Sequence, residues 1–264
     1  MSKKQKNNDL LQVAVESAIN ASQLIMNALD SPRAIDYKGQ TDLVTETDHK
    51  SENLIKSIIK SFFPEHSFLA EESGKEINTS DYLWVIDPLD GTTNFVHGYP
   101  SFAVSIALYY QKIPKIGVVL EMPNTKLYSA INGQGSWCEG EPITCSDTKE
   151  LINSLMVTGF GYNHDDNWEK NMLLFKQFTN ESQGVRRLGS AAVDLCHLAA
   201  GKVDAFWEFD LKPWDTAAGF IIAKESGAVV TQLDGSDFSI YDNTILATNP
   251  YLHQIIKEKA KLII

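Results

Sequence analysis

The sequence of 264 residues has only three cysteines and no long apolar run. Three thiols at irregular spacing do not suit a disulfide framework or a zinc site, so we expect them to be reduced, as in a cytoplasmic protein. No stretch approaches the roughly 18 consecutive apolar residues of a membrane-spanning helix, so we expect no membrane association. The lysine-rich start is followed by acidic Asp9 and Glu16 rather than by an apolar core, which disfavours a signal peptide.

Positive charge is also scarce: 23 Lys and Arg residues stand against 34 Asp and Glu residues, which gives a formal net charge of -11. An acidic surface repels nucleic-acid phosphates, so we expect no nucleic-acid partner. A phosphorylated small molecule stays compatible with this charge, because bound metal cations can reverse the sign of the local field. Apolar residues make up 43% of the chain, as in ordinary globular proteins.

Hydrophobic spacing divides the chain into two unlike halves. Apolar residues recur at helical spacing over 9–29 and 46–63. Apolar runs joined by short turns over 102–131 predict antiparallel strands. Farther on, strand and helix patterns alternate, and no repeat or long linker interrupts them. We therefore predict an α+β protein of stacked helix and sheet layers, a single domain with an N-terminal lobe over about 1–150 and a C-terminal lobe over about 151–264.

Acidic side chains follow two apolar runs that we interpret as buried strands. Glu71 follows the run 68–70, and Asp87 follows the run 82–86, where we expect the second strand to end. Carboxylates at strand ends and helix starts can converge on one crevice, and Asp48 and Asp215 are two further candidates for it. Carboxylates that converge repel one another unless divalent cations bind between them, and hard oxygen ligands select Mg²⁺ or Mn²⁺ rather than zinc.

The segment after Asp87 adds a possible anion site. Asp90-Gly91-Thr92-Thr93 offers a carboxylate, a flexible turn, two hydroxyls and consecutive backbone N–H groups. Such a turn binds a phosphate if it opens a helix. Any single motif of this kind has an ordinary explanation as a turn or a solvated edge, so the hypothesis depends on the arrangement of all of them.

These residues resemble a known family. The stretch Asp87-Pro88-Leu89-Asp90-Gly91-Thr92-Thr93-Asn94-Phe95 resembles the first signature of the inositol monophosphatase family, and Trp214-Asp215-Thr216-Ala217-Ala218-Gly219 is similar to its second. Segments 42–48, 71–74 and 189–208 resemble its other motifs, so the resemblance covers the chain from about residue 10 to 260. It implies a five-layered αβαβα sandwich, Mg²⁺ dependence, inhibition by lithium and a homodimer.

The resemblance also implies roles for individual residues. Two to three Mg²⁺ ions per subunit, with Mn²⁺ as a possible substitute, would be held by Glu71, Asp87, the carbonyl of Leu89, Asp90 and Asp215. Thr92, polarised by Asp48, would act with Glu71 to activate the attacking water. The N–H groups of Gly91, Thr92 and Thr93 would hold the phosphate of the substrate. Its remainder would be bound by Asp90, Gly189, Ser190, Ala191, Glu208 and Asp215. Lys38 is a further candidate for contact with metal-bound water.

The reaction is better determined than the substrate. Glu208 matches the family position that contacts inositol hydroxyls, so inositol 1-phosphate is our first expectation. A carboxylate there also suits other sugar hydroxyls, which leaves open the 2′-phosphate of NADP, fructose 1,6-bisphosphate, histidinol phosphate and bisphosphate nucleotides. A function of another class, a regulatory binding protein with secondary phosphatase activity, is disfavoured, because a pure binding module has no use for the full acidic set.

Overall fold

The computed structural model describes residues 3–29, 35–37 and 43–264, so Lys38 and Asp42 lie outside the described residues. An eight-stranded sheet has the order β10-β9-β8-β7-β6-β5-β3-β4. Its strands are β3 (Ser67–Ala70), β4 (Gly74–Glu76), β5 (Tyr82–Asp90), β6 (Phe102–Tyr110), β7 (Ile113–Met122), β8 (Lys126–Ile131), β9 (Gly135–Cys138) and β10 (Glu141–Pro142). The neighbours from β5 to β10 pair antiparallel, as predicted for 102–131, whereas β3 and β5 are parallel.

A five-stranded sheet follows, in the order β12-β11-β13-β15-β14. Its strands are β11 (Leu155–Thr158), β12 (Gly184–Arg186), β13 (Ala205–Phe209), β14 (Val229–Thr231) and β15 (Thr244–Thr248). The first sheet ends at Pro142 and the second begins at Leu155, near the lobe boundary that we placed at about 150. That the two lobes form one domain stays a prediction.

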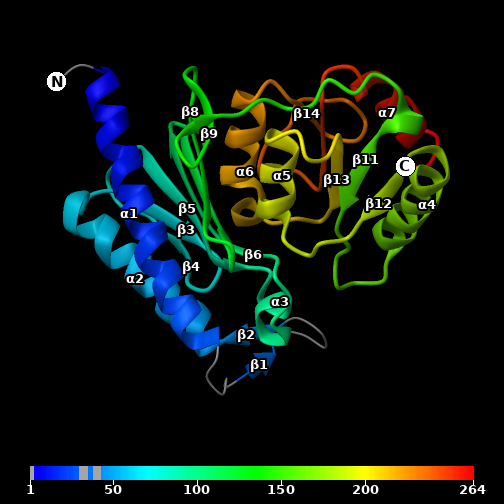
Figure 1. Cartoon of the computed structure of the whole chain (residues 1–264). Helices are drawn as coiled ribbons and strands as arrows, with labels where there is room; N and C mark the ends of the chain where they lie inside the picture. The colour runs from blue at the N-terminus through cyan, green and yellow to red at the C-terminus, as the bar shows by residue number, and fades with distance from the viewer. Residues whose placement is uncertain (1–2, 30–34, 38–42) are drawn as a thin grey trace.

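Helices fill the remaining layers (Figure 1). They are α1 (Lys3–Leu29), α2 (Glu46–Phe62), α3 (Thr92–His97), α4 (Asp166–Glu181), α5 (Ala191–Ala199), α6 (Pro213–Glu225) and α7 (His253–Ala260), beside a short pair β1 (Ile35–Tyr37) and β2 (Leu43–Thr45) and a 3₁₀ turn, Leu151–Asn153. The helices α1 and α2 cover the outer face of the first sheet, α5 and α6 lie between the sheets, and α4 and α7 cover the outer face of the second. The five-layered αβαβα sandwich is confirmed.

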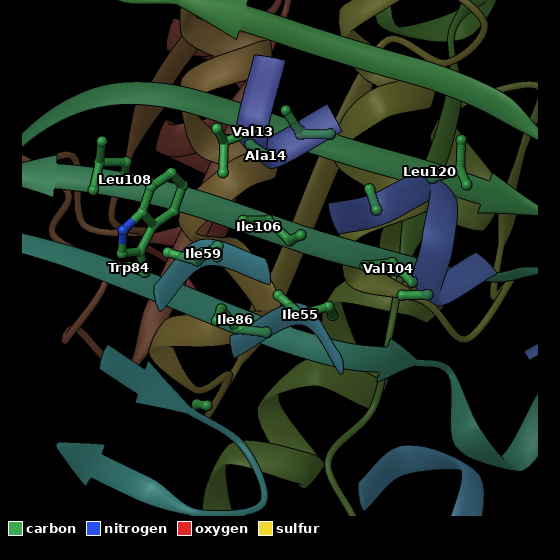
Figure 2. Packing of buried hydrophobic residues seen from close by; sticks show 14 of the residues in the cluster. Val13, Ala14, Ile55, Ile59, Trp84, Ile86, Val104, Ile106, Leu108 and Leu120 are labelled. Carbon is green, nitrogen blue, oxygen red and sulfur yellow. The ribbon is translucent and has the colours of Figure 1, made fainter. Parts of the chain in front are cut away.

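The outer helices are held to the first sheet by an apolar core (Figure 2). Ile55 and Ile59, one turn apart on α2, are fully buried and lie near Trp84 and Ile86 of β5. Burial of each aliphatic side chain of this size contributes about 1.5–3 kcal/mol. This packing fixes α2, and with it Asp48 at the start of that helix, relative to β5. None of the helices in the described part of the chain is long and apolar enough to cross a membrane.

Strand β5 does not end at Asp87, as we expected, but continues to Asp90. Asp87 pairs with Ser105 and Asp90 with Ala103, so β5 carries one residue more than β6 over this interval. Such a bulge accommodates Pro88, which has no N–H to donate, inside a sheet. Side chains alternate between the faces of a regular strand, and the extra residue allows both Asp87 and Asp90 to line the same cavity.

Candidate active site

A cavity of about 880 Å³ lies where β5, α3, α5, β13 and α6 meet. Most of the predicted site residues line it: Glu71, Asp87, Leu89, Asp90, Gly91, Thr92, Gly189, Ser190, Ala191, Glu208 and Asp215. Two do not. Asp48 lies behind Thr92, and the Thr93 hydroxyl is buried with no hydrogen-bond partner within the described part of the chain. The structure therefore brings together segments that are more than a hundred residues apart.

The two aspartates of β5 are each anchored by hydrogen bonds. The Leu89 N–H donates to Asp87 Oδ1 over 3.0 Å. Asp90 Oδ2 accepts hydrogen bonds from Ser190 Oγ at 2.6 Å and from the Ala192 N–H at 2.8 Å. These two donors belong to the N-terminal end of α5, so Asp90 connects the first signature to the segment 189–195 across the cavity.

Asp48 and Thr92 form a hydroxyl–carboxylate pair. Thr92 Oγ1 lies 2.9 Å from Asp48 Oδ1 and 3.0 Å from the Leu89 carbonyl oxygen. The other oxygen of Asp48 accepts from the N–H and the hydroxyl of Thr45, at 2.8 and 2.6 Å, in a capping box at the start of α2. Burial raises the pKa of Asp48, and the bonds from Thr45 and Thr92 counteract that rise. A carboxylate held in this way fixes the orientation of the Thr92 hydroxyl.

Asp215 lies at the start of α6, where Pro213 occupies the first turn. Its Oδ2 accepts a hydrogen bond from the Lys212 N–H at 2.7 Å, so the helix start itself orients the carboxylate. Burial raises the pKa of Asp215 well above its ordinary value, and the charges of Asp90 and Glu71 raise it further. This motif is thus coupled electrostatically to the first signature.

The remaining carboxylates of this side repel one another as well. Burial raises the pKa of Asp87 well above its ordinary value, and the charges of Glu71, Asp90 and Asp215 add to the rise. Burial also raises the pKa of Asp90 to about 6, despite its hydrogen bonds from Ser190 and Ala192. Crowded carboxylates of this kind are stabilised by a divalent cation, and an all-oxygen donor set suits Mg²⁺ or Mn²⁺.

The acidic side chains of the cavity do not all converge on one point. Within the described ranges, no three His, Cys, Asp or Glu side chains are drawn together tightly enough to form a ready-made metal cluster. One cavity is nevertheless lined by all four carboxylates, Glu71, Asp87, Asp90 and Asp215. The charges of the other three raise the pKa of Asp87. The chemistry of these donors fits a hard divalent cation, with the Leu89 carbonyl as an additional oxygen at the same wall.

Gly91 and Asn94 allow the two halves of the cavity to approach closely. Gly91 has a φ of 85°, and a Cβ there would lie 3.0 Å from the Ser101 carbonyl oxygen and 3.1 Å from that of Gly189. Asn94 Nδ2 donates to the carbonyl oxygens of Ser101 and Leu188, at 2.6 and 2.7 Å. Glycine is required at this turn because of both its backbone angle and the lack of space.

The α5 wall of the cavity holds a carboxylate that we did not predict from the sequence. Asp194 of α5 lines the cavity, is 1% exposed, and has no hydrogen-bond partner for either oxygen within the described chain. Burial raises the pKa of Asp194 well above its ordinary value, and Glu208 adds to the rise while Arg187 lowers it. One signal was present in the sequence: Asp194 is the only acidic residue of the mostly apolar helix Ala191–Ala199.

Comparison with known proteins agrees with this geometry. The family model described as "Inositol monophosphatase family" matches residues 6–263. The chain is 48% identical over 257 residues to the chloroplastic phosphatase IMPL1 of Arabidopsis thaliana, covering 95% of this chain and 69% of that protein. It is 42% identical to the inositol-1-monophosphatase of Synechocystis, covering 94% and 87%.

A solved structure supports the same assignment at the level of the fold. The inositol monophosphatase from Anabaena superposes with a TM-score of 0.88 at 39% identity, and 97% of each chain is covered. The family match, the two relatives and this superposition all extend over nearly the whole chain, including both signature segments and the cavity between the sheets. The chain belongs to the inositol monophosphatase family and is a phosphoric monoester hydrolase.

Proposed function

We propose that this enzyme hydrolyses inositol 1-phosphate to inositol and phosphate in a Mg²⁺-dependent reaction. The observation that carries the proposal is a single cavity lined by Glu71, Asp87, Asp90 and Asp215, with the Thr92 hydroxyl oriented at its wall by Asp48. Hydrolysis of a phosphate monoester is among the slowest uncatalysed reactions, so the site must stabilise a large developing charge.

Glu71, Asp87, Asp90, Asp215 and the Leu89 carbonyl would hold two to three Mg²⁺ ions, or Mn²⁺ in their place. Bound divalent cations at such a site neutralise phosphate oxygens, lower the pKa of water and stabilise the leaving oxygen. The carboxylates of this site repel one another and so raise one another's pKa. Cations that bind between them would remove this repulsion, which favours their binding.

The Thr92 and Glu71 side chains would prepare the attacking water. A threonine hydroxyl is a poor base, but when it donates its hydrogen to Asp48 its lone pairs can accept a hydrogen bond from water. The water oxygen forms the new bond to phosphorus while the bond between phosphorus and the alcohol oxygen breaks. Glu71 would accept the water proton, and a proton from solvent would complete the alcohol product.

The N-terminus of α3 would bind the phosphate group. The chain turns sharply at Gly91 into Thr92–His97, so the N–H groups of Gly91, Thr92 and Thr93 start a helical turn beside the acidic wall. Backbone N–H groups at a helix start favour anions. On this proposal Thr93 contributes through its backbone, since its side chain does not line the cavity.

The alcohol portion of the substrate would lie against Asp90, Gly189, Ser190, Ala191 and Glu208, with Asp215 near the leaving oxygen. Glu208 is almost fully buried, and its carboxylate meets the cavity, where it can accept hydrogen bonds from hydroxyls. A cavity of about 880 Å³ also admits larger substrates, so NADP, fructose 1,6-bisphosphate and other sugar or nucleotide phosphates are the alternatives. We further propose a cytoplasmic homodimer.

Phosphate release measured with and without EDTA tests the reaction. We expect turnover to disappear with chelation, to return with Mg²⁺, and to fall with millimolar lithium, since a small monovalent cation can occupy a hard-ion site. Activity that is indifferent to EDTA, or unharmed by Asp90→Asn, would contradict the metal-dependent reaction and favour a regulatory binding role.

A panel assay tests the substrate. It compares kcat/KM for inositol 1-phosphate, fructose 1,6-bisphosphate, NADP and adenosine 3′,5′-bisphosphate at saturating Mg²⁺. We expect inositol 1-phosphate to rank first. If it ranked last, the substrate assignment would be wrong even though the reaction class would stand.

A further inference from the structure

Glu208 lies in a slot that exists only because residue 159 is glycine. Gly159 follows the last residue of β11, and the neighbouring strand β13 carries Glu208. A Cβ built on Gly159 would overlap both carboxylate oxygens of Glu208. The backbone angle at Gly159 does not lie in the left-handed region, so conformational freedom does not account for glycine here. The requirement is one of space for the carboxylate.

A buried hydrogen-bond network fixes the wall of this slot. Asn171 Nδ2 of α4 donates to the Gly159 carbonyl oxygen at 2.6 Å, and Trp207 Nε1 donates to Asn171 Oδ1 at 2.7 Å. The Thr158 hydroxyl donates to the Trp207 carbonyl oxygen at 2.6 Å. Asn171 is 1% exposed and Thr158 and Trp207 are fully buried, so Gly159 and the residue before Glu208 are held in one rigid unit.

Glu208 itself has no comparable anchor. Within residues 43–264 no hydrogen bond or ion pair to its carboxylate is found, although both Gly159 and Glu208 line the cavity. Burial raises its pKa well above the ordinary value, the charges of Asp215 and Asp90 raise it further, and the charge of Arg187 lowers it. The position of this carboxylate is therefore determined by the shape of its surroundings rather than by donors.

We propose that Gly159, held in place by Asn171, is a positioning residue that directs the Glu208 carboxylate toward the hydroxyl groups of the substrate. The inference rests on the proposed function, in which Glu208 contacts the alcohol portion. The slot then contributes to specificity for hydroxylated leaving groups without touching the metal-binding side. Placement errors of about 1 Å in a catalytic site can cost as much as about 100-fold in rate, so the displacement of one carboxylate by a methyl group is measurable.

Steady-state kinetics of Gly159→Ala test the slot. We expect KM for inositol 1-phosphate to rise by about tenfold or more, within the range that misplacement produces. The leaving group of p-nitrophenyl phosphate has no hydroxyls for Glu208 to bind, so the variant loses no contact with this substrate. Its kcat and KM should therefore change by less than about twofold. The matched control is Gly161→Ala, two residues away, where an added Cβ meets no atom within 4 Å. Equal effects on both substrates would overturn the proposal.

A second pair of variants separates this inference from the proposed function. If Glu208→Gln leaves KM for inositol 1-phosphate unchanged, the assigned role of Glu208 fails. If Glu208→Gln raises KM but Gly159→Ala does not, only the slot fails. Shortening the carboxylate relieves the overlap, so Gly159→Ala should have little further effect on KM in a Glu208→Asp background. A full additional effect in that background would contradict the steric coupling.

The network offers a test that does not add a methyl group, in case Gly159→Ala does not fold. Asn171→Ser removes the donor to the Gly159 carbonyl and leaves the slot open. We expect a higher KM for inositol 1-phosphate, with p-nitrophenyl phosphate turnover retained. An unchanged KM for inositol 1-phosphate would show that the Gly159 wall needs no support and would contradict the proposed positioning.

Discussion

The two sides of the cavity hold their carboxylates in different ways. On the β5 side, defined here by Asp87, Asp90 and Asp215, each carboxylate accepts at least one hydrogen bond, from the Leu89 N–H, Ser190 Oγ and the Lys212 N–H respectively. On the β13 side, defined by Asp194 and Glu208, no hydrogen bond reaches either carboxylate within the described chain. Both sides are acidic and at least partly buried, and the pKa of every one of the five groups is raised.

The two sides therefore differ in what positions their carboxylates: hydrogen-bond donors on the β5 side and packing on the β13 side. Oriented donors on the β5 side counteract the rise in pKa and fix the direction of each carboxylate, which suits ligands for cations. The β13 side depends on packing, which can change with the shape of the substrate without disturbing the acidic motifs. We therefore expect that the reaction and the substrate preference can be altered independently.

The largest effect is expected for Asp87→Asn on the β5 side. An asparagine keeps an acceptor for the Leu89 N–H but loses the charge, so kcat should fall by about 100- to 1,000-fold, as when a main electrostatic group is removed. In EDTA the same variant should unfold at a higher temperature than the wild type, because it removes one of several repelling buried charges. Opposite signs for activity and stability are the signature of a functional charge cluster.

Phosphate release at saturating Mg²⁺ and thermal unfolding in EDTA measure the two quantities. The control is Asp147→Asn, which makes the same substitution at an exposed position. If Asp87→Asn kept activity within about tenfold of wild type, the β5 side would not be the main source of transition-state stabilisation.

The next effect concerns pH in the absence of metal. The folded pKa of Asp90 is about 6 against an ordinary value of 3.8, so between these values the folded state binds more protons than the unfolded state. The free energy of unfolding should therefore decrease as pH rises through this window, by at most about 3 kcal/mol from this group. Mg²⁺ should flatten the dependence, since the cation compensates the charge.

Urea unfolding in EDTA at several pH values measures this dependence, and Asp90→Asn isolates the contribution of the group. The free energy of unfolding of the wild type should decrease relative to that of the variant as pH rises from about 4 to about 6. A relative gain over that range would mean that the carboxylate is stabilised in its charged form without any cation.

The same contrast explains how much could be predicted from the sequence. Two of the three carboxylates on the β5 side are anchored by neighbours in the chain: the donor to Asp87 is Leu89, and the donor to Asp215 is Lys212. Asp90 is the exception, because its donor Ser190 lies 100 residues away. Local contacts of this kind are what a motif records, and hydrophobic periodicity likewise predicted α2 and the antiparallel strands. The continuation of β5 to Asp90 was missed, because Pro88 ordinarily ends a central strand and the bulge depends on the register with β6.

The β13 side depends on contacts between distant segments, which periodicity does not reveal. Gly159 meets Glu208 only because β11 and β13 are neighbours in the second sheet. Asp194 was passed over within an apolar helix, although its lone charge was a usable signal. For Thr93 the resemblance implied phosphate binding through the backbone N–H group, which does not need the side chain to line the cavity, and that role stays a prediction.

A smaller effect is expected for Asp194→Asn on the β13 side. Neither oxygen of Asp194 has a partner within the described residues, so removing the charge should raise the free energy of unfolding by about 1 kcal/mol. The matched control is Asp204→Asn, at a similarly buried carboxylate whose oxygens accept from Ser146 Oγ and the Leu155 N–H at 2.6 and 2.7 Å. That change should lower stability. Urea unfolding of both variants measures these changes in the free energy of unfolding. Destabilisation by Asp194→Asn would indicate a partner that stabilises the charged form of Asp194.

The smallest effect is expected for His97→Ala, a change that lies on neither side of the cavity. His97 ends α3, is exposed and does not line the cavity, although it follows the first signature closely in sequence. If carboxylates and metal-bound water supply the acid–base chemistry, kcat/KM for inositol 1-phosphate should change by less than about twofold at any pH, since no proton transfer then passes through the imidazole. The pH profile of kcat/KM is the measurement. A tenfold loss, or an altered basic or acidic limb of the profile, would assign proton transfer to the imidazole and remove the reason for assigning that step to Glu71.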